Sequence, residues 1–147
     1  MNANDIVLAE ESDKDYLVFS VAVKQQEMAI SLRRAKNGLI LMQLLNESTP
    51  DVLFLDLLLP LKSGRQCIKE IRADQRYDDL PIIAYTGVQD LESIEFCYRE
   101  GANLYVFKPT DEATLVSILR RILSIDWKKT LYFPQRSQFV IGNENAV

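Results

Sequence analysis

The sequence of 147 residues predicts a doubly wound α/β fold, in which helices cover both faces of a five-stranded parallel sheet. Two observations support this prediction. Five short apolar segments alternate along the chain with five segments of helical length, the order expected of repeated strand–helix units. Most of the apolar segments are continuous rather than alternating, as expected for strands buried on both faces. Five such units are too few to close a barrel, so the sheet is expected to be open.

The expected strands are recognised by their apolar residues. The segments "DIVLA", "DVLFLD", "LPIIAYT" and "NLYVFK" are short and mostly apolar, as buried strands are. The segment "MAISLRRA" alternates only roughly and is interpreted as a more exposed strand. In chain order, the five strands are expected at residues 5–9, 28–35, 51–56, 80–86 and 103–108.

The intervening segments carry residues that begin or end helices. They span residues 13–25, 37–48, 65–74, 90–100 and 110–123. Asn37, Asp90 and Thr110 are placed to cap three of these helices at their N-termini, and Gly101 marks the end of one. These signals fix the order of the elements more firmly than their exact bounds.

The first expected helix follows several acidic residues. Asp13 or Asp15 could cap it or assist a metal site, and capping is the favoured interpretation. Its buried face is expected to include the apolar residues of the stripe Leu17, Val18, Val21 and Ala22.

The composition excludes several classes of function. The net charge of −4 argues against nonspecific binding to nucleic acid or to acidic membranes, which requires a basic face. Histidine is absent, so Ser-His-Asp and Cys-His catalysis and imidazole zinc sites are excluded. Cys67 and Cys97 lie far apart, without a CxxC motif, and are expected to be buried thiols in a reducing compartment. No signal peptide or membrane-spanning segment is recognised, so a cytoplasmic protein without membrane partners is expected.

Chemically active residues gather where the expected strands end. Glu10 and Glu11 follow the first strand, Asp56 ends the third, Thr86 ends the fourth and Lys108 ends the fifth. Ligands of open α/β sheets bind beyond the carboxyl ends of the strands, so these side chains are expected to share one crevice. Three carboxylates without histidine or thiolate favour Mg²⁺ over zinc. Together with a hydroxyl and an ammonium group, they indicate phosphoryl chemistry at a carboxylate nucleophile.

At this point the chain resembles the receiver domain of two-component response regulators. The motifs "LAEESDKD", "LFLDLLLPLKSG", "IIAYTG" and "GANLYVFKP" carry the resemblance, in the right order and at the right strand ends. The resemblance covers about residues 5–124 and implies a flavodoxin-like (βα)5 fold with strand order 2-1-3-4-5. We therefore expect a receiver domain at 1–124 and a C-terminal extension at 125–147, either docked on the domain or forming a dimer contact. The sequence of residues 59–72 is most similar to that of single-domain regulators of the phytochrome-associated type.

The resemblance also implies roles for individual residues. Asp56 would accept the phosphoryl group, and Thr86 and Lys108 would grip it. Mg²⁺ would be bound by Glu11 directly, by Glu10 through water, by Asp56 and by the backbone carbonyl of Leu58. Tyr105 would be a switch aromatic that reorients when phosphorylation draws Thr86 inward, and a cis bond is implied between Lys108 and Pro109.

Two positions depart from the family pattern. The acidic pair is usually Asp-Asp or Glu-Asp, so Glu11 is one methylene longer than expected, which could reshape the metal site. The position of Leu58 is often polar, and an apolar side chain there would slow attack by water on the acyl phosphate.

The leading interpretation is a signalling switch that catalyses only its own phosphorylation and dephosphorylation. A sensor histidine kinase or phosphotransfer protein would supply the phosphoryl group, and the output would be a contact with a downstream protein, with a homodimer also open. The alternative is a pseudo-receiver that binds partners without phosphorylation, for which Glu11 is the only support. An aspartate-based phosphatase is disfavoured, because it needs a second acid where Leu58 stands.

Overall fold

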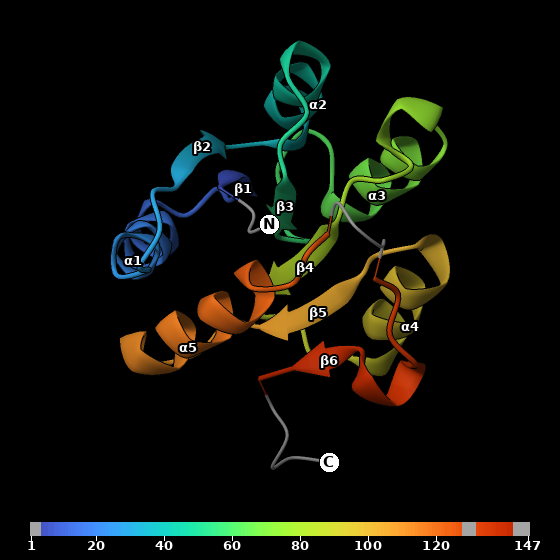
Figure 1. Cartoon of the computed structure of the whole chain (residues 1–147). Coiled ribbons are helices and arrows are strands. Elements are labelled where there is room, and N and C mark those ends of the chain that lie inside the picture. The colour runs from blue at the N-terminus through green and yellow to red at the C-terminus, as the bar shows by residue number, and fades with distance from the viewer. Residues whose placement is uncertain (1–3, 128–131, 143–147) are drawn as a thin grey trace.

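The computed structural model describes residues 4–127 and 132–142, and its centre is one parallel sheet between two layers of helices (Figure 1). The strand order is β2-β1-β3-β4-β5-β6, which confirms the predicted order 2-1-3-4-5 for the first five strands. The prediction of five strands was wrong, because a short sixth strand pairs in parallel with β5. The strands are β1 (Asp5–Ala9), β2 (Ser31–Ala35), β3 (Val52–Leu55), β4 (Ile82–Thr86), β5 (Leu104–Phe107) and β6 (Val140–Ile141).

Five helices cover the sheet, and their apolar residues form a separate core on each face. Residues of α1 and α5 pack on one face, and residues of α2, α3 and α4 pack on the other (Figure 1). The helices are α1 (Asp13–Lys24), α2 (Gly38–Glu47), α3 (Gly64–Arg72), α4 (Leu91–Glu100) and α5 (Glu112–Leu123), with short 3₁₀ helices η1 (Gln75–Tyr77) and η2 (Arg136–Gln138). Every residue of β3, β4 and β5 is buried, which explains their continuous apolar sequences. The predicted doubly wound, flavodoxin-like fold is confirmed.

Two of the predicted helix caps form and one moves by a residue. The side chains of Asn37 and Asp90 accept hydrogen bonds from the first turns of α2 and α4. Gly101 ends α4 with a φ of 99°, a left-handed conformation that glycine adopts without strain. The cap of α5 is Asp111 rather than Thr110. Asp is a stronger cap than Thr, so the helix begins one residue later than predicted.

The first helix differs from its prediction in both its cap and its buried face. Ser12 caps α1 by accepting a hydrogen bond from the Asp15 N–H group, so capping by Asp13 or Asp15 was wrong. The buried residues of α1 are Phe19, Ala22 and Val23, whereas Leu17 is 61% exposed. Apolar residues occupy two overlapping stripes of this helix, and the stripe that contains the larger aromatic ring packs on the sheet.

The described part of the C-terminal extension packs on the edge of the sheet. Phe139 is fully buried, and its carbonyl oxygen accepts a hydrogen bond from the backbone N–H group of Tyr105 in β5. The Nδ2 atom of Asn103 donates to the carbonyl oxygen of Tyr132 at 2.6 Å, and the indole of Trp127 donates to the carbonyl oxygen of Ile122. The extension predicted at 125–147 as a docked tail or dimer contact lies partly outside the described residues, because residues 128–131 and 143–147 are not described.

The two cysteines lie within the protein as predicted. Both are free thiols and both are buried. Burial raises the pKa of Cys67 to about 11 and that of Cys97 to about 12, so each behaves as an apolar core residue rather than as a nucleophile.

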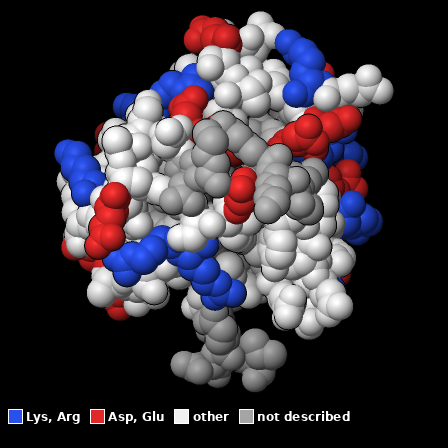
Figure 2. Space-filling view, in the orientation of Figure 1, with Lys and Arg blue, Asp and Glu red and all other residues white. Residues whose placement is uncertain are grey.

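Charged side chains of both signs lie on the face of the molecule that Figure 2 shows. On the face shown in Figure 2, Lys and Arg side chains lie among Asp and Glu side chains rather than in one continuous basic surface. No helix within residues 4–127 and 132–142 has the length and apolar character needed to cross a bilayer.

Candidate functional site

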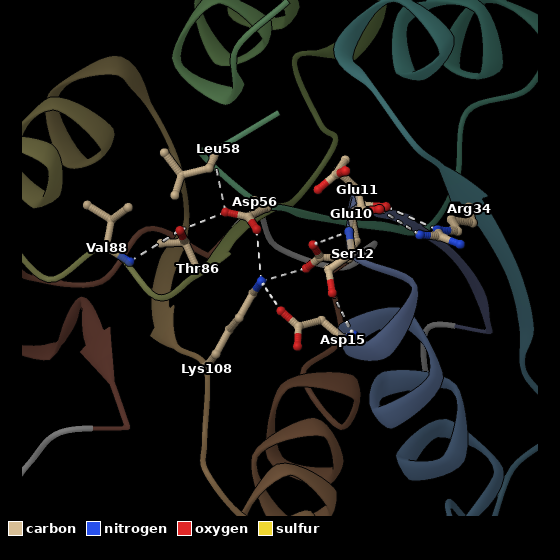
Figure 3. A network of polar contacts seen from close by, with 10 residues as sticks. All are labelled: Glu10, Glu11, Ser12, Asp15, Arg34, Asp56, Leu58, Thr86, Val88 and Lys108. Atoms are coloured by element: carbon tan, nitrogen blue, oxygen red, sulfur yellow. Dashed lines mark hydrogen bonds and ion pairs between the residues drawn. The ribbon is translucent and has the colours of Figure 1, made fainter. Parts of the chain in front are cut away.

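The structure brings Asp56, Thr86 and Lys108 together beyond the carboxyl ends of β3, β4 and β5 (Figure 3). Asp56 is only 4% exposed, and its two carboxylate oxygens have different partners. The hydroxyl of Thr86 donates to Oδ1 of Asp56 at 2.7 Å, and Nζ of Lys108 donates to Oδ2 at 2.8 Å. One oxygen of the central carboxylate is therefore held by a hydroxyl group from the end of β4, and the other by an ammonium group that follows β5.

The loop after β3 is shaped around this carboxylate. The backbone N–H group of Leu58 donates to Oδ1 of Asp56 at 3.1 Å, while the Leu58 side chain is 69% exposed. Further along, the N–H group of Gly64 donates to the carbonyl oxygen of Leu57. A Cβ atom at Gly64 would lie 2.4 Å from the carbonyl oxygen of Asp56, so only glycine permits this close return of the chain.

The acidic pair after β1 places its two side chains differently. Glu10 is 2% exposed, and its Oε2 atom accepts a hydrogen bond from the N–H group of Ser12 at 3.1 Å. Its Oε1 atom lies 2.7 Å from Nζ of Lys108, as an ion pair outside hydrogen-bond geometry. Burial raises the pKa of Glu10, and contacts with Lys108 and Ser12 oppose this only in part. Glu11 is exposed at the mouth of the crevice.

Lys108 is the common partner of three carboxylates. Its Nζ atom lies 2.7 Å from Glu10, 2.8 Å from Asp15 and 2.8 Å from Asp56 (Figure 3). Burial alone would lower the pKa of Lys108, but its contacts with these three carboxylates raise it above its ordinary value. The site thus has a permanent cation at its centre.

Asp15 was favoured as a cap of the first helix, whereas its side chain belongs to this cluster. It lies in the first turn of α1, where side chains lean toward the N-terminus of the helix and therefore toward the crevice. Its nearness to the acidic pair that follows the first strand was the available signal. The lysine partner, 93 positions away, could not be read from the sequence.

The donor chemistry of the site fits a hard cation such as Mg²⁺. The possible ligand atoms that face the crevice are carboxylate and hydroxyl oxygens, which Mg²⁺ prefers over nitrogen or sulfur. As they stand, the acidic and thiol side chains of residues 4–127 and 132–142 form no ready-made metal cluster of three or more ligands. Lys108 already contacts three of these carboxylates. A bound metal would therefore need the side chain of Glu11 to turn into the crevice, and it would share the carboxylate of Asp56 with Lys108.

Tyr105 connects the site to the edge of the sheet. The ring is fully buried, and its hydroxyl donates to the carbonyl oxygen of Val88 at 2.7 Å. Val88 follows β4, and its N–H group donates to the hydroxyl of Thr86. On its other side, the Tyr105 ring lies 6.2 Å from that of Phe139, between centroids. Contacts therefore run from Asp56 through Thr86 and Tyr105 to the extension.

The bond between Lys108 and Pro109 is trans, because the described residues contain no cis peptide bond. The implied cis bond was therefore wrong. The N–H group of Lys108 donates to the carbonyl oxygen of Thr86, which continues the hydrogen bonding between β4 and β5 as far as the site. The trans isomer is the more favourable one for a bond that precedes proline.

The model of the family described as "Response regulator receiver domain" matches residues 6–120. The chain therefore belongs to the response regulator receiver family, the phosphorelay module of two-component systems. In that family the phosphorylated group is an aspartate and the bound cation is Mg²⁺.

Similar proteins come from several regulatory systems. The chain is 35% identical over 89 residues to the transcriptional regulator NtrC of Escherichia coli K12, matching 60% of this chain but only 19% of NtrC. It therefore spans about a fifth of the length of that relative. It is 24% identical to protein PilH of Pseudomonas aeruginosa, covering 81% of this chain and 97% of PilH.

Solved structures share the fold. The phosphorylated cyanobacterial phytochrome response regulator RcpA superposes with a TM-score of 0.78 at 24% identity, covering 90% of this chain and 99% of RcpA. The Mn²⁺-bound form of response regulator Rcp1 superposes with a TM-score of 0.76, also at 24% identity and with the same coverage. The phytochrome-associated resemblance expected from the sequence thus has counterparts among the structural neighbours.

Proposed function

We propose that this receiver accepts a phosphoryl group on Asp56 from a histidine kinase or phosphotransfer protein, and then signals through a contact with a downstream protein. The convergence of Lys108 and Thr86 on the two oxygens of Asp56 carries this proposal. A carboxylate oxygen of Asp56 would attack phosphorus while the bond from phosphorus to the donor breaks. The ammonium and the hydroxyl would then neutralise the charge on the transferred oxygens, which is the main catalytic task in phosphoryl transfer.

Mg²⁺ would be held by Asp56, the Leu58 carbonyl and Glu11, with Glu10 acting through water. When bound, the cation supplies charge neutralisation on the phosphoryl oxygens. Two neighbouring structures support this part of the proposal, since that of Rcp1 is a Mn²⁺-bound form and that of RcpA is phosphorylated. Glu10 is already oriented by Ser12, whereas Glu11 is the longer and more exposed ligand.

The output would pass through Thr86 and Tyr105. Thr86 already donates to Asp56, and Tyr105 is already buried, so this chain can adopt the inward arrangement before phosphorylation. A phosphoryl group would then stabilise an arrangement that is present, rather than create a new one. A downstream protein would recognise this change at the surface around β5, where Phe139 and β6 are packed.

The decisive experiment is to incubate the full chain with acetyl phosphate and Mg²⁺ and to measure its intact mass. We expect a gain of about 80 Da, the mass of one phosphoryl group, that requires Mg²⁺ and is lost in Asp56→Asn. Asp56→Asn keeps the size of the side chain, so loss of the adduct would reflect chemistry rather than packing. No adduct at any Mg²⁺ concentration would favour the pseudo-receiver, and sustained turnover of many phosphoesters would favour a phosphatase.

Leu58→Asn is expected to shorten the lifetime of the phosphorylated form. The Leu58 side chain projects into solvent beside Asp56, where an amide could orient an attacking water molecule that leucine cannot. The measurement is the decay of the phosphorylated fraction by mass spectrometry after removal of the donor. Leu61→Asn is the matched control, since Leu61 is 75% exposed in the same loop. Equal half-lives in wild type and Leu58→Asn would contradict the prediction.

A further inference from the structure

Arg34 reaches from β2 to the turn that carries the acidic pair. Its Nε atom donates to the carbonyl oxygen of Glu10 at 3.0 Å, and one terminal nitrogen donates to the carbonyl oxygen of Glu11 at 3.1 Å. The other terminal nitrogen lies 2.8 Å from the carboxylate of Asp13. The guanidinium carbon also lies 4.6 Å from the centre of the Tyr16 ring. All three nitrogens are thus engaged with the segment between β1 and the first turn of α1, and the side chain is 14% exposed.

The position of Arg34 separates it from the phosphoryl chemistry. In Figure 3 its guanidinium lies on the far side of Glu10 and Glu11 from Asp56. It binds the backbone carbonyl groups of the acidic pair rather than their carboxylates. Arg34 therefore holds the chain from which both acids project, without competing with a metal for their oxygens.

This anchoring matters more for a glutamate than for an aspartate. Glu11 has one more rotatable bond than aspartate, so its carboxylate can occupy more positions for a given position of the backbone. Mg²⁺ demands nearly ideal octahedral geometry and tolerates little displacement of its ligands. A fixed backbone at Glu11 removes one source of displacement, and the rigid planar fork of arginine can bind two adjacent carbonyl groups at once.

We propose that Arg34 is a positioning residue of the metal site, which holds the acidic turn so that Glu11 can reach a cation bound beside Asp56. This inference rests on the proposed function, in which Mg²⁺ binds this crevice. Electrostatics alone predicts the opposite effect of removing Arg34, because a positive charge near a cation site weakens cation binding. Weaker Mg²⁺ binding after removal of Arg34 therefore indicates a positioning role, whereas tighter binding indicates that its charge dominates.

The test is a calorimetric Mg²⁺ titration of the full-length wild type, Arg34→Gln, Arg34→Lys and Arg33→Gln. We expect Arg34→Gln to weaken Mg²⁺ binding by about 10- to 100-fold, the usual effect of removing a group that orients a metal ligand. Arg34→Lys should be intermediate, because lysine keeps the charge but not the fork. Arg33→Gln removes the same charge from the same strand, but Arg33 contacts Asp5 and the carbonyl of Ser48, so wild-type affinity is expected.

Two further measurements exclude a merely structural effect. In the metal-free protein, the amides of residues 10–16 should exchange hydrogen faster in Arg34→Gln but not in Arg33→Gln. In phosphorylation by acetyl phosphate, the Mg²⁺ concentration for half-maximal rate should rise, while the rate at saturating Mg²⁺ should stay close to wild type.

Unchanged or tighter Mg²⁺ binding by Arg34→Gln would overturn the inference, as would an equal loss in Arg33→Gln or a wild type that binds no Mg²⁺. If the wild type binds Mg²⁺ but forms no phosphorylated adduct, the proposed function fails. The positioning role of Arg34 is still decided in that case, by the titration and the hydrogen exchange.

Discussion

Lys108→Met is expected to destabilise the metal-free protein by roughly 3–5 kcal/mol, because removal of one partner leaves buried charges uncompensated. The side chains of Glu10 and Asp56 are 2% and 6% exposed, and Lys108 lies within 2.8 Å of both. Added Mg²⁺ should stabilise the variant more than the wild type, since the cation takes the place of the ammonium and binds only the folded state. Urea unfolding followed by circular dichroism, with and without Mg²⁺, measures both effects.

Lys62→Met is the matched control for this substitution. Lys62 also forms a close ion pair, at 2.6 Å, but its partner Glu70 is 46% exposed. Exposed pairs contribute about 0–1 kcal/mol, so this variant should unfold close to wild type and respond normally to Mg²⁺. If the two lysine variants lost equal stability, Lys108 would not be the counterion that holds the carboxylate cluster together.

Phe139→Ala is expected to lower the free energy of unfolding by about 3–5 kcal/mol, the usual cost of truncating a buried phenylalanine. The ring is fully buried and packs edge-on against Tyr98, with 5.1 Å between centroids. The ring also contacts Tyr105, so its removal should change the near-ultraviolet circular dichroism of the tyrosines. Urea unfolding measures the loss of stability.

Phe133→Ala provides the comparison within the same extension. Phe133 is 54% exposed, and substitutions at such positions usually change stability by less than about 0.5 kcal/mol. A loss below about 1 kcal/mol in Phe139→Ala would mean that the extension does not remain packed on β5 in solution, since a core phenylalanine costs more.

The sequence predicted the first five strands and five helices because local patterns determine them. Continuous apolar segments identify strands buried on both faces, and Asn37, Asp90 and Gly101 mark helix ends by their own chemistry. It did not predict β6, which has two residues and is stabilised by the edge of β5 and the burial of Phe139. An element so short has no pattern of its own, so only the fold reveals it.

The sequence predicted those residues of the candidate site that lie at the ends of strands. Asp56, Thr86 and Lys108 converge because parallel strands end at the same edge of the sheet. Asp15 reaches Lys108 from a helix, and Arg34 reaches the acidic turn from an edge strand, over side-chain distances that sequence spacing does not specify. The departure at Leu58 was visible in the sequence, but its exposure and its N–H bond to Asp56 required the structure.

The place of β6 has a consequence for the newly synthesised chain. Its partner β5 ends at Phe107, whereas β6 begins at Val140, so β5 is made well before the strand that covers its edge. At usual rates of synthesis, roughly 30 residues take about 2–6 s. During that interval β5 presents unpaired backbone groups, which are a template for pairing with another chain. The edge of β5 therefore stays open to such pairing until the segment around Phe139 has emerged from the ribosome.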